Sequence, residues 1–219
     1  MEQKAKKSLK LAVDGTLCVL LLCLMAYPVT GEVWHEWIGI AMTVLLIVHH
    51  GLNACWYASL FRGRYNAYRI LVTVVNTALL ASIALTALCG MSMSAHALPF
   101  LYGLLPVAFA RRIHLALSYW SFLLMGLHLG LHLPAMTAGI RPGRAARIVL
   151  NLLFAGVAGF GLYAFVRNGI PGYLFFRTPF AFFDYGKPAL LVFAENVAEL
   201  FAFAWIGANA VRLTRKKKG

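Results

Sequence analysis

Six long apolar stretches dominate the sequence, and each is long enough to cross a membrane as a helix. A transmembrane helix needs about 20 mainly apolar residues. The stretches cover about 9–27, 33–60, 66–90, 109–133, 144–166 and 188–211. They occupy most of the 219 residues, so no room is left for a soluble catalytic domain. The sequence therefore predicts an all-α fold, a polytopic membrane helix bundle of six transmembrane helices in a single domain, 1–219.

The composition agrees with this fold class. Hydrophobic residues make up 61% of the chain and charged residues 12%, whereas soluble domains carry about 25% charged residues. The net charge of +13 does not indicate nucleic-acid binding, because so apolar a chain has little soluble surface to carry a basic face. We therefore expect contact with membrane lipid and none with nucleic acid.

The basic residues fall mainly on one side of the predicted bundle. That side holds Lys4, Lys6, Lys7, Lys10, Arg62, Arg64, Arg69, Arg141, Arg144, Arg147, Arg212, Arg215, Lys216, Lys217 and Lys218. The other side holds Arg111, Arg112, Arg167, Arg177 and Lys187. Basic residues concentrate in cytoplasmic loops. We expect both termini in the cytoplasm and a multi-pass protein of the bacterial inner membrane.

Lysines followed by an apolar run also begin secretory signal peptides. Here Asp14 interrupts the run, and no small-x-small cleavage site precedes Pro28. We expect a retained first helix. The four cysteines form no Cys-x-x-Cys pattern, which argues against covalently attached haem and iron–sulfur clusters.

Six of the seven histidines lie on two stretches, and their spacing is regular. His35 and His49 are 14 residues apart, as are His114 and His128. Fourteen helical residues return to within about 40° of the starting direction and rise about 21 Å. Since both stretches run from outside to inside, His35 and His114 face each other near the outer surface, and His49 and His128 face each other deeper. Two such pairs suit two six-coordinate b haems held between helices.

The remaining histidines leave alternatives open. His50 points about 100° away from His49 and is a weaker candidate ligand. His132 lies one turn after His128, and it serves a haem propionate, a donor site or a structural role equally well. His128 and His132 also have zinc-like spacing, but no third ligand is placed beside them. Arg111 and Arg112 precede His114, where outer propionates need cations. His96 is expected to be an ordinary exposed side chain.

Two carboxylates, Glu195 and Glu199, lie four residues apart on the sixth stretch. Buried carboxylates in a membrane must pair or face a cavity. They either handle protons for a quinone near the outer haem or bond buried amides or Trp205. Hydrogen bonding inside the bundle is the commoner use of such residues.

A set of local motifs in 8–135 resembles a family of small bacterial inner-membrane proteins of unknown function. The motifs are His35-Glu36-Trp37-Ile38-Gly39, His49-His50-Gly51-Leu52-Asn53 with Trp56, His114 with Tyr119-Trp120, and His128-Leu129-Gly130-Leu131-His132. Members of that family often lie beside flavodoxin-like or reductase genes. More distantly, the spacing resembles the transmembrane domain of ferric reductases and NADPH oxidases. It is also similar to the haem-binding membrane subunit of the periplasmic methionine sulfoxide reductase system and to the cytochrome b of quinol-oxidising complexes.

The resemblance implies that His35, His114, His49 and His128 are axial ligands to the iron of two stacked b haems. It implies a haem-binding four-helix core over 8–135, with two additional transmembrane helices in 136–219 that match no motif. Nothing in the chain resembles the cytoplasmic flavin domain of ferric reductases. A flavin or quinone therefore has to be supplied by a partner.

These observations predict a di-haem b-type cytochrome that passes electrons across the membrane as a component of an oxidoreductase. The expected donor is a cytoplasmic flavoprotein or flavodoxin-like protein, and the acceptor is ferric iron, oxygen, a quinone or a periplasmic reductase. One alternative is a quinol-coupled cytochrome b subunit of a larger oxidoreductase. Others are a haem-free membrane transporter that uses His and Glu for protons or metal, and a passive membrane anchor.

Overall fold

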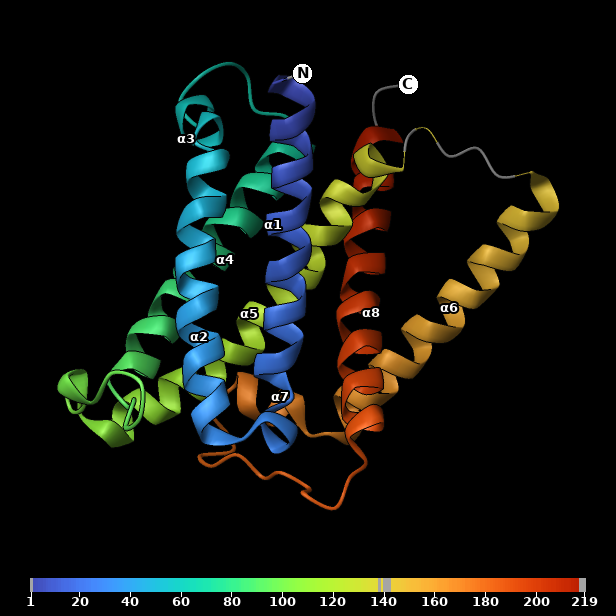
Figure 1. Cartoon of the computed structure of the whole chain (residues 1–219). Coiled ribbons are helices and arrows are strands. Elements are labelled where there is room, and N and C mark those ends of the chain that lie inside the picture. The colour runs from blue at the N-terminus through green and yellow to red at the C-terminus, as the bar shows by residue number, and fades with distance from the viewer. Residues whose placement is uncertain (1, 138, 140–142, 217–219) are drawn as a thin grey trace.

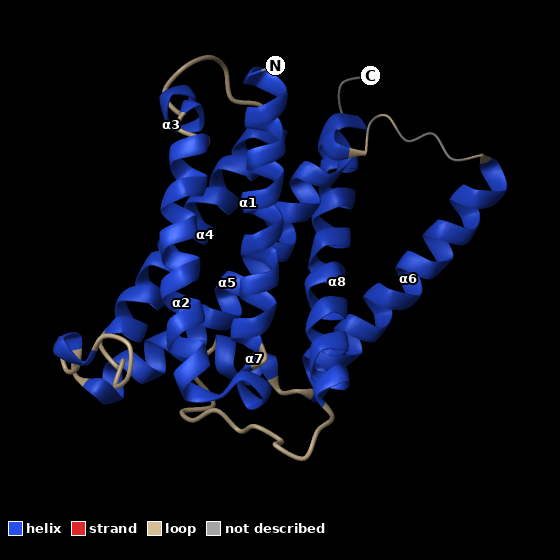
Figure 2. Cartoon of the chain, in the orientation of Figure 1, coloured by secondary structure: helices blue, strands red, loops and turns tan. Residues whose placement is uncertain are grey.

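The computed structural model describes residues 2–137, 139 and 143–216, and every regular element in that part of the chain is a helix (Figures 1 and 2). The helices are α1 (Glu2–Met25), α2 (Tyr27–Leu52), α3 (Cys55–Ser59), α4 (Ala67–Met91), η1 (Pro99–Leu101), α5 (Val107–Met136), α6 (Arg144–Arg167), α7 (Ile170–Leu174) and α8 (Ala189–Lys216). Six of these, namely α1, α2, α4, α5, α6 and α8, are long and apolar enough to cross a membrane. The chain has the fold of a multi-pass membrane protein, as the sequence predicts.

The start of α1 and the end of α8 lie at the same end of the bundle (Figure 1). We call this the inner end, following the orientation that the sequence predicts. The opposite, outer end carries the connections 92–106 and 168–188. Arg141, Lys217 and Lys218 contribute to the charge pattern but lie outside the described residues.

The second stretch is shorter than expected, because α2 ends at Leu52 and not near residue 60. The reason is local. The Asn53 side chain donates to the His49 carbonyl (2.9 Å) and accepts from Lys10 Nζ of α1 (2.9 Å). These bonds satisfy a carbonyl of the last turn and fix the end of the helix. The chain then continues as the short helix α3.

The link between the first two helices is also tighter than the sequence indicates. Ala26 alone separates α1 from α2, and Pro28 lies in the first turn of α2, where its missing N–H costs nothing. Gly31 has a φ of 70° and a ψ of 175° and bends the start of α2. The two helices therefore form an antiparallel hairpin.

The bundle consists of this hairpin and a second group of helices. Helix α5 packs against α4 and α8, and α8 also packs against α6. Helix α2 packs mainly against α1 and only slightly against α4. Helix α6 diverges from the bundle toward the inner end (Figure 1). The two histidine-bearing helices, α2 and α5, thus belong to different groups and face each other across the interior.

An apolar layer joins the two groups at mid-depth. Its buried members come from α1, α2, α4, α5 and α8: Val13, Leu17, Leu21, Met42, Leu79, Ile83, Phe122, Met125 and Leu200. Met42 lies midway between His35 and His49 in sequence, and Phe122 lies between His114 and His128, eight residues after the first and six before the second. The layer therefore separates the outer histidines from the inner ones.

Glycines allow α8 to approach its neighbours closely. A Cβ on Gly130 of α5 would lie 2.0 Å from the Ala204 carbonyl oxygen, and one on Gly161 of α6 would lie 2.1 Å from the Ala198 carbonyl oxygen. Small residues are the usual means of close helix packing in membranes. They let α8 serve as the common support of α5 and α6.

Replacing Gly161 with Ala should destabilise the protein, because the new methyl group meets backbone atoms of α8 that have nowhere to move. Overpacking of this kind costs about 1–3 kcal/mol, measurable as a lower thermal unfolding midpoint in detergent. Gly159→Ala is the matched control on the same helix, because a Cβ there meets nothing within 4 Å. Equal unfolding midpoints for the two variants would contradict this account of the packing.

Candidate functional site

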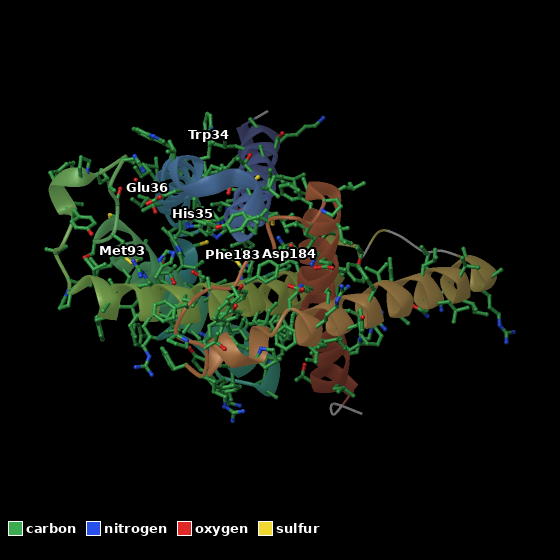
Figure 3. The ribbon with its side chains drawn as sticks, turned by 90° about the horizontal axis from the view of Figure 1, so that it is seen from below. Trp34, His35, Glu36, Met93, Phe183 and Asp184 are labelled. Atoms are coloured by element: carbon green, nitrogen blue, oxygen red, sulfur yellow. The ribbon has the colours of Figure 1, made fainter. Side chains whose placement is uncertain are left out.

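Two histidines meet at the outer end of the bundle. His35 lies near the start of α2 and His114 near the start of α5. Their ring centroids are 6.0 Å apart, with the ring planes at 72°. Viewed from the outer end, His35 points into the bundle while its neighbour Trp34 points away from it (Figure 3). The sequence spacing and the fold thus bring side chains 79 positions apart to one place.

Both rings line a large, mainly apolar cavity of about 640 Å³. Its walls come from α1, α2, α4, α5 and the connection that follows α7. It extends from the outer end down to Met42 and Ser121 at mid-depth. Cofactor sites in proteins commonly measure about 300–1,000 Å³ and are lined mostly by apolar groups, so this cavity has the size and character of one.

Aromatic side chains close the outer side of the cavity. The Tyr27 ring meets the His35 ring edge-on, with the ring centroids 5.2 Å apart. It also stacks on the Phe183 ring, with the centroids 5.1 Å apart. Phe183 belongs to the connection between α7 and α8 and lies close to His35 in the view from the outer end (Figure 3). The outer connection 168–188 is therefore part of the site.

Four histidines gather at the inner end. His128 and His132 of α5 have ring centroids 4.7 Å apart, and His49 and His50 of α2 have centroids 5.4 Å apart. His49, His50 and His132 are all close enough to His128 to interact with it electrostatically. Helices α2 and α5 therefore bring their inner histidines together, as they do the outer ones.

The Nδ1 atoms of three of the four predicted ligands are held by acceptors on neighbouring helices. His49 donates to Asp14 of α1 (2.7 Å), and His128 donates to the Asn76 amide oxygen of α4 (2.9 Å). His114 donates to the Thr86 carbonyl of α4 (2.9 Å). A ring that donates from Nδ1 keeps the lone pair on Nε2, which is the usual arrangement of a metal-binding histidine.

His35 differs from the other three. Its Nδ1 is buried and has no hydrogen-bond partner, although the backbone of Leu24 lies beside the ring. An unpaired buried nitrogen is costly, and this cost indicates that the ring has a role besides packing.

Neither histidine pair has the surroundings of a small-ion site. Among the described residues, the group of three or more His, Cys, Asp or Glu with ligand atoms within 4.8 Å of one another is Glu32, Glu36 and His96 at the outer surface. Zinc is normally held by three or four protein ligands. Two imidazoles alone suit a metal whose other positions are filled by a macrocycle.

Hydrogen bonds explain why the Glu36 carboxylate lies beside the outer connection. Its carboxylate accepts from Ser94 Oγ (2.7 Å) and from the N–H groups of Ala95 (3.0 Å), His96 (2.9 Å) and Ala97 (2.7 Å). It therefore anchors the outer connection 92–106 to α2. His96 is exposed, as the sequence predicts.

The weaker candidates for contact with a haem lie at both ends of the bundle. Arg111 lines the outer cavity, whereas the guanidinium of Arg112 lies 5.6 Å from the Phe176 ring centroid. His50 is held by the Tyr57 hydroxyl of α3 (2.7 Å). His132 lies beside His128. Arg111 is thus the outer arginine that borders the cavity.

The two carboxylates of α8 are buried, with Glu195 3% and Glu199 1% exposed. The Asn168 amide donates to Glu195 (2.9 Å) and to Glu199 (3.2 Å), and Lys187 forms an ion pair with Glu195. The amide that the pair bonds belongs to an exposed residue at the end of α6. The carboxylates tie α8 to the end of α6 and to the outer connection.

Several residues of the site were not assigned from the sequence. Asp14, Asn76 and the Thr86 carbonyl hold histidines, and Tyr27 covers one. Polar side chains inside apolar stretches, such as Asp14 and Asn76, are visible signals because each needs a partner. Backbone acceptors such as the Thr86 carbonyl leave no trace in a sequence.

Comparison with protein-family models finds no match, and comparisons with curated proteins and with solved structures find no significant similarity. The function is therefore inferred from the residues of this chain alone.

Replacing Glu36 with Gln should loosen the outer connection. The new amide group donates where the carboxylate accepted, so at least one N–H of 95–97 loses its partner. We expect faster hydrogen exchange of these amides, measured by mass spectrometry of the purified protein. Glu32→Gln, one turn earlier on an exposed side chain, is the control. Unchanged exchange in Glu36→Gln would show that the carboxylate does not anchor the connection.

Proposed function

We propose that the chain is a transmembrane di-haem cytochrome of the b type, the electron-transfer component of a membrane oxidoreductase. His35 and His114 hold the outer haem, and His49 and His128 hold the inner one. The haem supplies one-electron redox chemistry, and the protein supplies binding, orientation and tuning. Each haem would be held by two imidazoles of this chain, a donor set that would supply electron transfer and not oxygen binding.

The observation that carries this proposal is the outer pair in its cavity. Metal–imidazole bonds are about 2 Å long, so two rings that share one metal have centroids about 6 Å apart. His35 and His114 have centroids 6.0 Å apart and line a cavity of about 640 Å³. The donor set and the volume both fit a haem.

The hydrogen bonds of the rings support the same assignment. Each acceptor fixes the orientation of its ring and leaves Nε2 for the metal. Asp14 supports His49 in this way, so His49 and not His50 is the proposed inner ligand. Asn76 does the same for His128.

The charge pattern supports an orientation with both termini in the cytoplasm of a bacterium. Electrons then enter at the inner end from a cytoplasmic flavoprotein and leave at the outer end to an external acceptor. Arg111, which borders the outer cavity, is placed to pair with haem propionates. The basic inner end suits an acidic flavodoxin-like donor.

The first test is the absorbance spectrum of the detergent-purified protein, oxidised and dithionite-reduced, with haem quantified per chain. We expect two low-spin b haems per chain. A colourless protein, even after expression with added haem precursor, would overturn the proposal and favour a haem-free transporter. If quinone-site inhibitors block haem reduction, the protein is a quinol-coupled cytochrome b subunit of a larger oxidoreductase.

The ligand assignment predicts how histidine variants lose haem. His35→Ala and His114→Ala should each remove the outer haem, and His49→Ala and His128→Ala should each remove the inner one, because each haem needs both of its ligands. Haem per chain should fall from two to one, and the remaining spectrum should be the same within each pair. His96→Ala is the control and should keep both haems. Haem loss in His50→Ala with none in His49→Ala would reassign the inner ligand.

A further inference from the structure

The acceptors of the four ligand rings differ in charge, and the difference follows the axis of the bundle. At the inner end, His49 donates to the Asp14 carboxylate (2.7 Å) and His128 to the Asn76 amide (2.9 Å). At the outer end, His114 donates to a neutral carbonyl (2.9 Å), and His35 Nδ1 has no hydrogen-bond partner. The carboxylate is the one charged acceptor among those of these four rings.

A hydrogen bond at Nδ1 makes the imidazole a stronger electron donor, and a carboxylate acceptor does so more than a neutral one. Electron donation to the iron stabilises its oxidised form. Hydrogen bonding around the axial ligands is a recognised means of setting haem potential. The inner site is therefore built for a lower midpoint potential than the outer site.

The Asp14 carboxylate is committed to this ring. Lys10 lies one turn earlier on α1, but its Nζ bonds to Asn53 (2.9 Å), and the ion pair that Asp14 forms within the described residues is with His49. The Asp14 side chain is 47% exposed, so its long-range field is screened. Its direct contact with the site is the hydrogen bond to His49, and it also interacts electrostatically with His132.

Charges of both signs border the outer cavity. Arg111 lines this cavity, and a cation beside a haem favours the reduced form. Two carboxylates also border it: Glu36, whose charge is stabilised by four donors of the outer connection, and Glu32, which is exposed like Arg111. These anions oppose the effect of Arg111, so the difference between the two sites depends on the direct contact of Asp14 with His49.

We propose that Asp14 is a positioning residue that lowers the midpoint potential of the inner haem below that of the outer haem and so directs electrons outward. This inference rests on the proposed function. Each transfer moves one electron from the inner site to the outer site, which oxidises the first and reduces the second. No bond forms or breaks and no proton moves. A reduced cytoplasmic flavoprotein supplies the electron, and an external one-electron acceptor removes it.

The test is a spectroscopic redox titration of the haem-loaded full chain. The haem that is lost in His128→Ala identifies the inner signal. In the wild-type protein we expect this signal to have the lower midpoint potential. In Asp14→Asn we expect it to shift upward, with a change of about tenfold in the ratio of reduced to oxidised inner haem at a fixed potential. A tenfold change corresponds to about 59 mV for one electron. The outer signal should stay where it is.

A second variant covers the case in which Asp14→Asn weakens haem binding. Asn76→Asp places a carboxylate on the opposite ligand, His128, and should shift the inner potential downward. Lys6→Gln is the control, because it removes a charge from an exposed position of the same helix, two turns before Asp14. It should shift neither signal.

The outcomes separate this inference from the proposed function. A wild-type protein without haem overturns both. Two haems of equal or reversed potential overturn the inference alone, and so does Asp14→Asn with both haems present and both potentials unchanged. If Asp14→Asn loses the inner haem, an unchanged or raised inner potential in Asn76→Asp also overturns it. A purely structural role for Asp14 would alter haem content without these opposite shifts.

Discussion

Lipid offers no hydrogen bonds, so polar groups inside the bundle must find their partners within the protein. The histidines satisfy this constraint in a way that fixes which helices are neighbours. His49 joins α2 to α1 through Asp14, and His128 joins α5 to α4 through Asn76. These bonds orient the rings and also hold the helix pairs together, so the site and the fold share the same interactions.

Helix α4 carries no histidine, yet it supports two of the three histidines of α5, His114 and His128. Its contacts with α5 include three polar bonds along the antiparallel pair: Thr86 with His114, Ser82 with Ser121, and Asn76 with His128. The residue numbers fall along α4 as they rise along α5, as they do in two antiparallel helices held in one register. A rotation of α4 by one residue, about 100°, would remove all three bonds. Helix α4, which lies between α2 and α5 in the sequence, thus orients a histidine at each end of the bundle.

Much of this arrangement could be predicted from the sequence, and the limits have physical causes. Apolar stretches of membrane length gave the six long helices, and the two 14-residue spacings indicated which histidines would share an end of the bundle. The end of α2 was misplaced because 54–61 remains largely apolar, while the residue that ends the helix, Asn53, acts through its contacts with His49 and Lys10. The acceptors of the rings were not assigned, because they depend on how neighbouring helices are rotated. The divergence of α6 follows from glycine contacts that become visible only when α8 is in place.

If the protein works as proposed, the apolar layer between the histidine sites affects what accompanies an electron across the membrane. None of its nine members is titratable; the hydroxyls of Ser82 and Ser121, which hydrogen-bond to each other, lie beside Ile83 and Phe122 of this layer. In a protein that works as proposed, the electron crosses about 21 Å of a hydrocarbon core about 30 Å thick. Such a transfer is electrogenic, since it moves charge without a compensating ion. The membrane potential contributes up to about 2.3 kcal/mol per 100 mV for each charge. Because the cytoplasmic side is negative, an energised membrane would favour the outward direction.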